Sequence, residues 1–167
     1  MTTDQDKADL AKLAGAVIER AIAADLMVTT AESCTGGMVA AALTDIAGAS
    51  AVLDRGVVTY SNAAKIDLLA VPEAVLAAHG AVSAETAASM ADGALRAAPQ
   101  ADIAIAVTGI AGPGGETADK PVGLVWFGLA IRGGRTVTTH HIFTGDRATV
   151  RHRAASTALT MMKDGIG

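Results

Sequence analysis

The apolar residues of this chain recur with two spacings, one helical and one typical of strands. Residues 4–24 have an apolar stripe through Leu10, Leu13, Val17 and Ile18 with charged residues elsewhere, which predicts an amphipathic helix. The same spacing, together with cap residues, predicts further helices over residues 36–45, 63–69, 72–79, 84–97 and 147–162. Short apolar runs bounded by turn residues predict strands over residues 26–30, 51–60, 103–107, 122–131 and 135–143.

The order of these elements predicts an α/β fold with a mixed sheet and helices on both of its faces. The run Ile-Ala-Ile-Ala-Val at 103–107 is apolar at every position, so we expect a strand that is buried on both sides. Gly133-Gly134 predicts a tight hairpin between the last two strands, and a bend is expected at Gly56. With 167 residues and no repeat or linker, the chain is expected to form one domain over residues 1–167.

Composition narrows the class of protein. Hydrophobic residues make up 51% of the chain and aromatic residues only 2%, so the core must consist of Ala, Val, Leu, Ile and Met. A net charge of −4 argues against a nucleic-acid partner. The single cysteine, Cys34, excludes an intrachain disulfide and indicates a reducing compartment. A charged N-terminus and the absence of a long apolar run predict a cytoplasmic protein without a membrane partner.

The segment around Ser33 is the first candidate for chemistry. A short apolar run ends there, the chain turns, and a helix is predicted to begin with Gly36 and Gly37 in its first turn. The N–H groups and the positive end of a helix suit a phosphate or an oxyanion, and Ser33 would point into such a site. Alternatively, Ser33 or Thr35 is only an N-cap, and the glycines let the helix pack against the sheet.

Lys65 is a candidate general base for Ser33. If Asn62 is the N-cap of the next helix, Lys65 lies near position N3, where the helix dipole and partial burial lower the pKa of its amine. A lysine that readily loses its proton can activate a serine. The alternative is a solvated charge. Tyr60, which ends a predicted strand, could relay a proton or stabilise an oxyanion, or could simply pack.

A second glycine-rich loop, residues 108–115, also follows a predicted strand. Ligands of open α/β sheets bind beyond the carboxyl ends of the strands, so we expect this loop to meet the segments at Ser33 and at 60–65. Arg147 and Arg151 lie four residues apart on the last helix and are candidates for binding a phosphate, or form a solvated basic face.

Cys34 is the rival nucleophile, but a catalytic cysteine usually has a histidine partner and none lies in these loops. We expect Cys34 to be a small buried residue beside the active serine. His140 and His141 are adjacent in a predicted strand and point to opposite faces, so they cannot share a metal ion. No spacing predicts a zinc site, and neither a metal nor a cofactor is expected.

Six motifs occur in an order that resembles the C-terminal domain family of CinA, the competence-damage-inducible proteins. They are Ala-Glu-Ser-Cys-Thr-Gly-Gly at 31–37, Val-Thr-Tyr-Ser-Asn at 58–62 with Lys65, Gly-Ala-Val-Ser at 80–83, Thr-Gly-Ile-Ala-Gly-Pro at 108–113, Pro-Val-Gly-Leu-Val at 121–125 and Gly-Asp-Arg at 145–147. The resemblance covers the chain from about residue 10 to its end. Stand-alone members of the family are nicotinamide-nucleotide amidohydrolases of the PncC type.

The resemblance implies a three-layer α/β/α fold and hydrolysis of the carboxamide of nicotinamide mononucleotide, a small-molecule pyridine nucleotide, without a metal. The expected catalytic residues are Ser33, Lys65 and Tyr60. The expected substrate ligands are Thr35, Gly36, Gly37, Thr108, Gly109, Gly112, Arg147 and Arg151. Whether Ser33 forms an acyl intermediate or Lys65 activates water, and which loop binds the phosphate, stay open. A silent nucleotide-binding or regulatory module is the alternative function, and an exposed edge strand favours a homo-oligomer.

Overall fold

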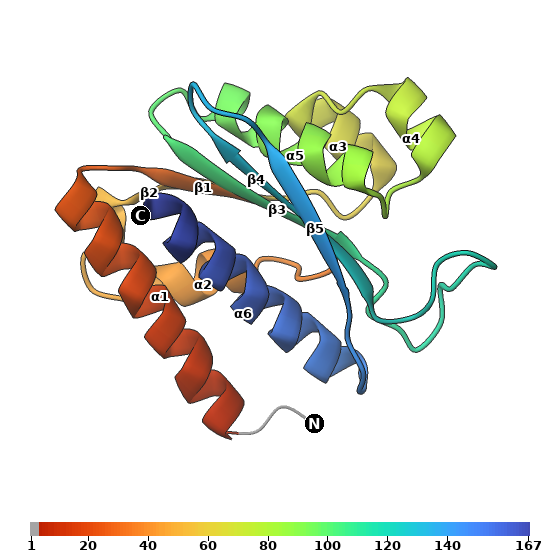
Figure 1. Cartoon of the computed structure of the whole chain (residues 1–167), viewed down its shortest axis with the longest axis horizontal. Coiled ribbons are helices and arrows are strands. Elements are labelled where there is room, and N and C mark those ends of the chain that lie inside the picture. Colours follow the sequence, from red (N-terminus) through yellow and green to blue (C-terminus); the bar gives the residue numbers. More distant parts are fainter. Residues whose placement is uncertain (1–3) are drawn as a thin grey trace.

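The computed structural model describes residues 4–167 and contains a five-stranded sheet with its helices (Figure 1). The elements are α1 (Asp4–Ala24), β1 (Val28–Glu32), α2 (Met38–Thr44), the 3-10 helix η1 (Ala49–Ala51), β2 (Leu53–Val58), α3 (Asn62–Leu69), α4 (Glu73–His79), α5 (Ala84–Ala97), β3 (Ile103–Gly109), β4 (Leu124–Ile131), β5 (Val137–Ile142) and α6 (Arg147–Ile166). Within residues 4–167, no helix has both the length and the apolarity needed to cross a membrane.

The sheet is mixed, as the sequence predicts. Its strand order is β2-β1-β3-β4-β5. β1 is parallel to both of its neighbours, β2 and β3, and β4 is antiparallel to both of its neighbours, β3 and β5. The carboxyl ends of β2, β1 and β3 therefore lie side by side at one rim of the sheet. β5 is an edge strand, in agreement with the expected open edge.

Helices cover both faces of the sheet (Figure 1). Helices α1, α2 and α6 lie on one face, and α3, α4 and α5 lie on the other. Each face has its own buried apolar cluster. The three-layer α/β/α architecture is thus confirmed.

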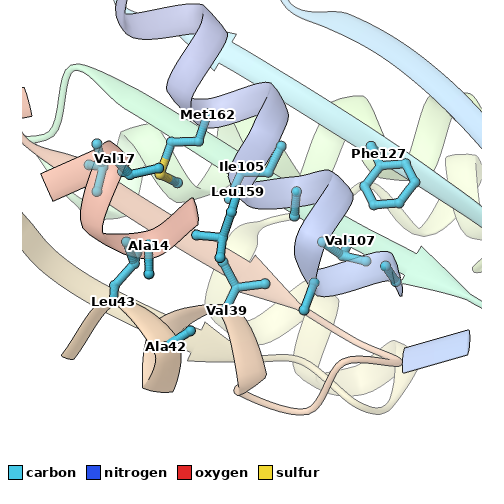
Figure 2. Close-up of a cluster of buried hydrophobic side chains, with 14 of the residues drawn as sticks. Ala14, Val17, Val39, Ala42, Leu43, Ile105, Val107, Phe127, Leu159 and Met162 are labelled. Carbon is cyan, nitrogen blue, oxygen red and sulfur yellow. The ribbon is translucent and has the colours of Figure 1, made fainter. Parts of the chain in front are cut away.

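The two faces of the central strand differ in side-chain size, which sets how closely each helix layer approaches. Ile103, Ile105 and Val107 belong to the cluster beneath α1 and α6, which Figure 2 shows in detail. Ala104 and Ala106 alternate with them and belong to the cluster beneath α5. Small residues on this second face let α5 pack close to the sheet, and the predicted burial of β3 on both faces is confirmed.

Several elements begin or end one or more residues away from the predicted position. The first strand lies two residues later than residues 26–30, and α2 begins at Met38 rather than at residue 36. The N-cap of α3 is Ser61, not Asn62, because the Ser61 hydroxyl accepts the N–H of Ala64. The register between β1 and β2 is irregular next to Val28, and the bend expected at Gly56 stays a prediction.

Two glycines within helices, Gly93 and Gly15, allow a matched test of how closely α5 packs against α3. A Cβ at Gly93 in α5 would lie 2.1 Å from the carbonyl oxygen of Leu69, whereas a Cβ at Gly15 in α1 would meet nothing within 4 Å. We expect Gly93→Ala to destabilise the fold by about 1–3 kcal/mol through overpacking, despite its better helix propensity. Gly15→Ala should stabilise it by about 0.5–1 kcal/mol.

Thermal unfolding of the two variants beside the wild type checks this prediction. The melting temperature should fall by several degrees for Gly93→Ala and rise slightly for Gly15→Ala, since about 1 kcal/mol shifts it by roughly 2–4 °C at this size. A Gly93→Ala protein as stable as the wild type would contradict the close approach of α3 and α5.

Candidate active site

Ser33 lies at the rim formed by the carboxyl ends of the three parallel strands. It follows the last residue of β1, and its N–H donates to the carbonyl oxygen of Val107 on β3 at 2.9 Å. On the other side, the N–H of Thr59 donates to the carbonyl oxygen of Glu32 at 2.8 Å. These bonds extend the sheet pairing past the ends of the strands and hold Ser33 between β2 and β3.

The side chain of Lys65 is buried against Ser33. It is only 1% exposed, and its Nζ lies 3.0 Å from Ser33 Oγ. The same nitrogen donates to the carbonyl oxygen of Thr59 at 2.7 Å. With Ser61 as the N-cap, Lys65 is the fourth residue of α3 rather than the third, so its distance along the helix is one position more than expected.

Burial lowers the pKa of Lys65 below its ordinary value, because the charged ammonium loses its hydration. The nearby Cys34 side chain has a smaller effect in the opposite direction. The expected direction is therefore confirmed, and its leading cause is desolvation by burial. An amine with a lowered pKa is a better proton acceptor near neutral pH than an ordinary lysine.

The carboxylate of Glu32 organises the turn that follows Ser33. Glu32 is fully buried, and its two oxygens accept the N–H groups of Gly37, Val39 and Ala40 at 2.9–3.1 Å. A carboxylate at this position satisfies the N–H groups that the start of a helix leaves unpaired and is favoured by its positive end.

Consequently, the amides of Gly36 and Gly37 do not point at a substrate. The N–H of Gly36 donates to the carbonyl oxygen of Ser33 at 3.0 Å, and that of Gly37 donates to Glu32. The expectation that these two amides bind an oxyanion is thus corrected, because an internal acceptor occupies each of them. Sequence reasoning missed Glu32; its signal is an acidic residue within a buried strand, five residues before the glycine that caps the next helix.

Two other amides of the turn remain available. Among residues 4–167, the N–H groups of Cys34 and Thr35 donate to no other residue, although the Cys34 N–H interacts with the sulfur of its own side chain. Arg151, expected to bind a phosphate, instead donates from Nε to the carbonyl oxygen of Cys34 at 3.1 Å and from Nη2 to that of Thr35 at 3.0 Å. Its guanidinium therefore holds the turn from outside the pocket described next.

A pocket of about 240 Å³ opens above Ser33. Its lining comes from the three loops that the sequence placed together, from a fourth segment before α5 and from the first residue of α6. The lining residues are Ser33, Cys34, Tyr60, Asn62, Lys65, Ala81, Val82, Thr108, Gly109, Ala111 and Arg147. The expected convergence of the loops is confirmed. Asn62 lies in the expected segment 60–65, whereas Ala81 and Val82 had not been expected there, although both lie within a motif of the sequence.

Arg147 and Tyr60 lie together at the exposed part of this pocket. The Nη2 of Arg147 donates to the hydroxyl of Tyr60 at 2.8 Å, and its Nη1 donates to the carbonyl oxygen of Gly112 at 2.7 Å. Tyr60 is 62% exposed, so it is not a packed core residue. A guanidinium has five N–H donors, and those not used in these two bonds can bind an anion.

The remaining expected ligands, Thr35, Thr108 and Gly109, differ in their surroundings. Thr35 is fully buried, and its hydroxyl has no hydrogen-bond partner among the described residues. The hydroxyl of Thr108 donates to the carbonyl oxygen of Ala81 at 2.6 Å and so ties the second glycine-rich loop to the segment before α5. Gly109 lies against Val125, whose Cγ2 would be 2.7 Å from an added Cβ, so a larger residue would displace the wall of the pocket.

Neither histidines nor carboxylates gather into a metal-binding group of three or more within residues 4–167. The ring of His140 lies tilted against that of Trp126 with centroids 4.4 Å apart, and the ring centroid of His141 lies 6.0 Å from that of Phe127. The two histidines thus contact different neighbours, in line with their expected orientation on opposite faces of β5.

Comparisons with known proteins identify relatives over nearly the whole chain. The model of the CinA C-terminal domain family matches residues 10–166. Proteins named nicotinamide-nucleotide amidohydrolase PncC are 59% identical in Enterobacter agglomerans, over 77% of each chain, and 49% identical in Escherichia coli K12, over 94% of this chain and 93% of the relative. The crystal structure of a competence/damage inducible protein from Agrobacterium tumefaciens superimposes with a TM-score of 0.89 at 49% identity, covering 92% of this chain and 93% of the other.

The thiol of Cys34 is expected to be unreactive in the folded protein. Burial raises the pKa of Cys34 to about 12, so its thiolate fraction at pH 8 is on the order of a thousandfold below that of an exposed cysteine. Alkylation by iodoacetamide, followed by intact mass, should be slower by at least this factor in the native protein than in concentrated urea. Rapid alkylation of the native chain would show an accessible thiol and reopen Cys34 as a nucleophile.

Proposed function

Because the chain belongs to the CinA C-terminal domain family, we propose that it hydrolyses the carboxamide of nicotinamide mononucleotide to nicotinate mononucleotide and ammonia. The observation that carries this proposal is the buried contact of 3.0 Å between Ser33 Oγ and Lys65 Nζ at the base of a pocket. Two relatives of similar length that carry the name nicotinamide-nucleotide amidohydrolase support the choice of substrate.

Lys65 acts as the general base. In its neutral form the amine has two hydrogens and one lone pair, and the carbonyl oxygen of Thr59 accepts one of the hydrogens. The lone pair of this amine is then the proton acceptor for the hydroxyl of Ser33, whose oxygen lies 3.0 Å from Nζ. The proton of Ser33 passes to Lys65 as the serine oxygen attacks the carboxamide carbon, which is the chemistry of serine–lysine hydrolases.

The attack forms a tetrahedral intermediate whose negative oxygen needs hydrogen-bond donors. The N–H groups of Cys34 and Thr35 are the available donors of the turn, and the residue after a nucleophile commonly supplies one of them. Protonated Lys65 then returns the proton to the leaving nitrogen, and ammonia departs from an acyl-Ser33 intermediate. Lys65 next deprotonates a water molecule that attacks the acyl group, and it returns this proton to the oxygen of Ser33 as the ester bond breaks and the nicotinate product leaves.

The nucleotide is oriented by the exposed part of the pocket. A volume of about 240 Å³ lies below the range of about 300–1,000 Å³ typical of sites that enclose a whole ligand, so the nicotinamide ring enters and the ribose phosphate stays at the mouth. There Arg147 offers its remaining N–H groups to the phosphate, and Tyr60 can donate its hydroxyl hydrogen. No step requires a metal, because Ser33 and Lys65 supply the nucleophile and the base.

Removing the nucleophile separates this proposal from a silent binding module. Ser33→Ala should lower the release of ammonia from nicotinamide mononucleotide by at least a thousandfold, measured after chelator treatment with a coupled ammonia assay. Cys34→Ala should stay within about tenfold of the wild type, because alanine keeps the backbone N–H. A wild-type protein that binds the nucleotide and releases no ammonia would instead support the binding module.

The role of Lys65 predicts a pH dependence with a definite sign. The neutral amine is the active form, so kcat/KM should rise with pH and level off above the lowered pKa of Lys65, which is below the ordinary value of 10.5. Lys65→Arg keeps the charge and cannot lose its proton, so kcat/KM should fall by about 10²–10⁴ and lose this rise.

Lys12→Arg is a matched control, since Lys12 is an exposed lysine on α1. Its pH profile should equal that of the wild type. If Lys65→Arg kept both the rate and the profile, another group would be the base.

A further inference from the structure

Arg151 makes a pair of contacts that the proposed reaction has not yet used. It lies on α6 one turn after Arg147, and its guanidinium bridges two successive carbonyl groups of the turn after Ser33. The side chain is partly buried and does not line the pocket. Both of its hydrogen bonds in this structure are therefore donated to backbone carbonyl groups of the turn.

The direction of these carbonyls fixes the direction of the amides. In a trans peptide the C=O and N–H groups point in opposite directions. By holding the carbonyl of Cys34, Arg151 turns the N–H of Thr35 away from itself. By holding the carbonyl of Thr35, it turns the N–H of Gly36 toward the carbonyl oxygen of Ser33, which it reaches at 3.0 Å.

That last bond orients the peptide between Ser33 and Cys34 in turn. Because the carbonyl of Ser33 points at Gly36, the N–H of Cys34 points the opposite way. The two amides that donate to no other residue, those of Cys34 and Thr35, are thus set by one chain of contacts that begins at Arg151.

We propose that Arg151 is a positioning residue that orients and polarises the backbone amides of Cys34 and Thr35 for the oxyanion. This inference rests on the proposed function and deepens it. A charged donor on a carbonyl makes the N–H of the same peptide a stronger donor, so the guanidinium acts without touching the substrate. Arg151 and Arg147 then have separate tasks, one behind the turn and one at the mouth of the pocket.

The turn is shaped to accept this guanidinium. Gly36 has a φ of +59°, and an added Cβ would lie 3.3 Å from Nη2 of Arg151. A lysine at position 151 would keep the charge but has no planar fork with which to hold two carbonyls in a fixed geometry.

The test compares Arg151→Met and Arg151→Lys with the control Arg153→Met. Arg153 lies on the same helix, is exposed, and donates to the carbonyl oxygen of Thr144 at 3.1 Å, away from the turn. For nicotinamide mononucleotide we expect kcat to fall about 10- to 100-fold in Arg151→Met with KM within about threefold, a loss below the full cost of an oxyanion donor. Arg151→Lys should retain part of the rate, and Arg153→Met should match the wild type.

A second measurement does not depend on the substrate. A fluorophosphonate probe modifies an activated serine and places its phosphoryl oxygen in the oxyanion site, so its rate of reaction with Ser33, followed by intact mass, should fall by a similar factor in Arg151→Met. Folding of each variant is checked by its melting curve. If Arg151→Met does not fold, the kinetics of ammonia release and the labelling rate are both measured on Arg151→Lys.

The outcomes separate the two proposals. A rise in KM for the nucleotide with an unchanged labelling rate would make Arg151 a phosphate ligand and overturn the inference, as would unchanged kcat and labelling in both variants. A wild-type protein that is labelled at Ser33 but releases no ammonia would refute the proposed function, and the labelling rates alone would then decide the role of Arg151. A wild type that shows neither would overturn both.

Discussion

The buried carboxylate of Glu32 is the constraint on which the rest of the site depends. A charge without exposure to water is costly unless hydrogen bonds compensate it, and Glu32 obtains three of them from the start of α2. These bonds fix the direction in which α2 leaves β1. The intervening turn must then follow one path, and that path sets the positions of Ser33 and of the amides behind it.

The burial of Lys65 depends on how the helix layer formed by α3, α4 and α5 packs on the sheet. α3 carries Lys65 and packs on α5, and α5 can approach the sheet closely because β3 presents Ala104 and Ala106 on that face. Close packing buries the amine, and burial lowers its pKa. A feature of the core, the alternation of large and small residues along one strand, is thereby linked to the proton affinity of the candidate base.

The arrangement also explains why two arginines on one helix face differ in their surroundings. Arg147 begins α6 at the mouth of the pocket and reaches Tyr60 and the second glycine-rich loop. Arg151 follows one turn later, where the backbone turn lies between it and the pocket. One turn of α6 thus separates a side chain at the exposed part of the pocket from one that holds the backbone of the turn.

Local patterns were sufficient for much of the architecture. The periodicity of α1 and the cap at Ser83 predicted residues 4–24 and 84–97 as they occur, and the uniform apolarity of β3 predicted its central place. The pairing of Ser33 with Lys65 followed from their motifs and is present, although 32 residues separate them. Helix bounds and strand burial depend on residues that are close in the chain, and the Ser33–Lys65 pair depends on parallel strands that end at the same rim. Sequence patterns indicate both kinds of feature.

Only the tertiary structure decided which amides of the turn are available and what each charged side chain faces. Gly36 and Gly37 have the composition of an anion site, but a carboxylate from the preceding strand and the carbonyl of Ser33 occupy their N–H groups. Arg151 reaches a carbonyl 117 residues away along the chain. The orientation of a peptide plane depends on groups that fold onto it from distant segments, and no local spacing records that orientation.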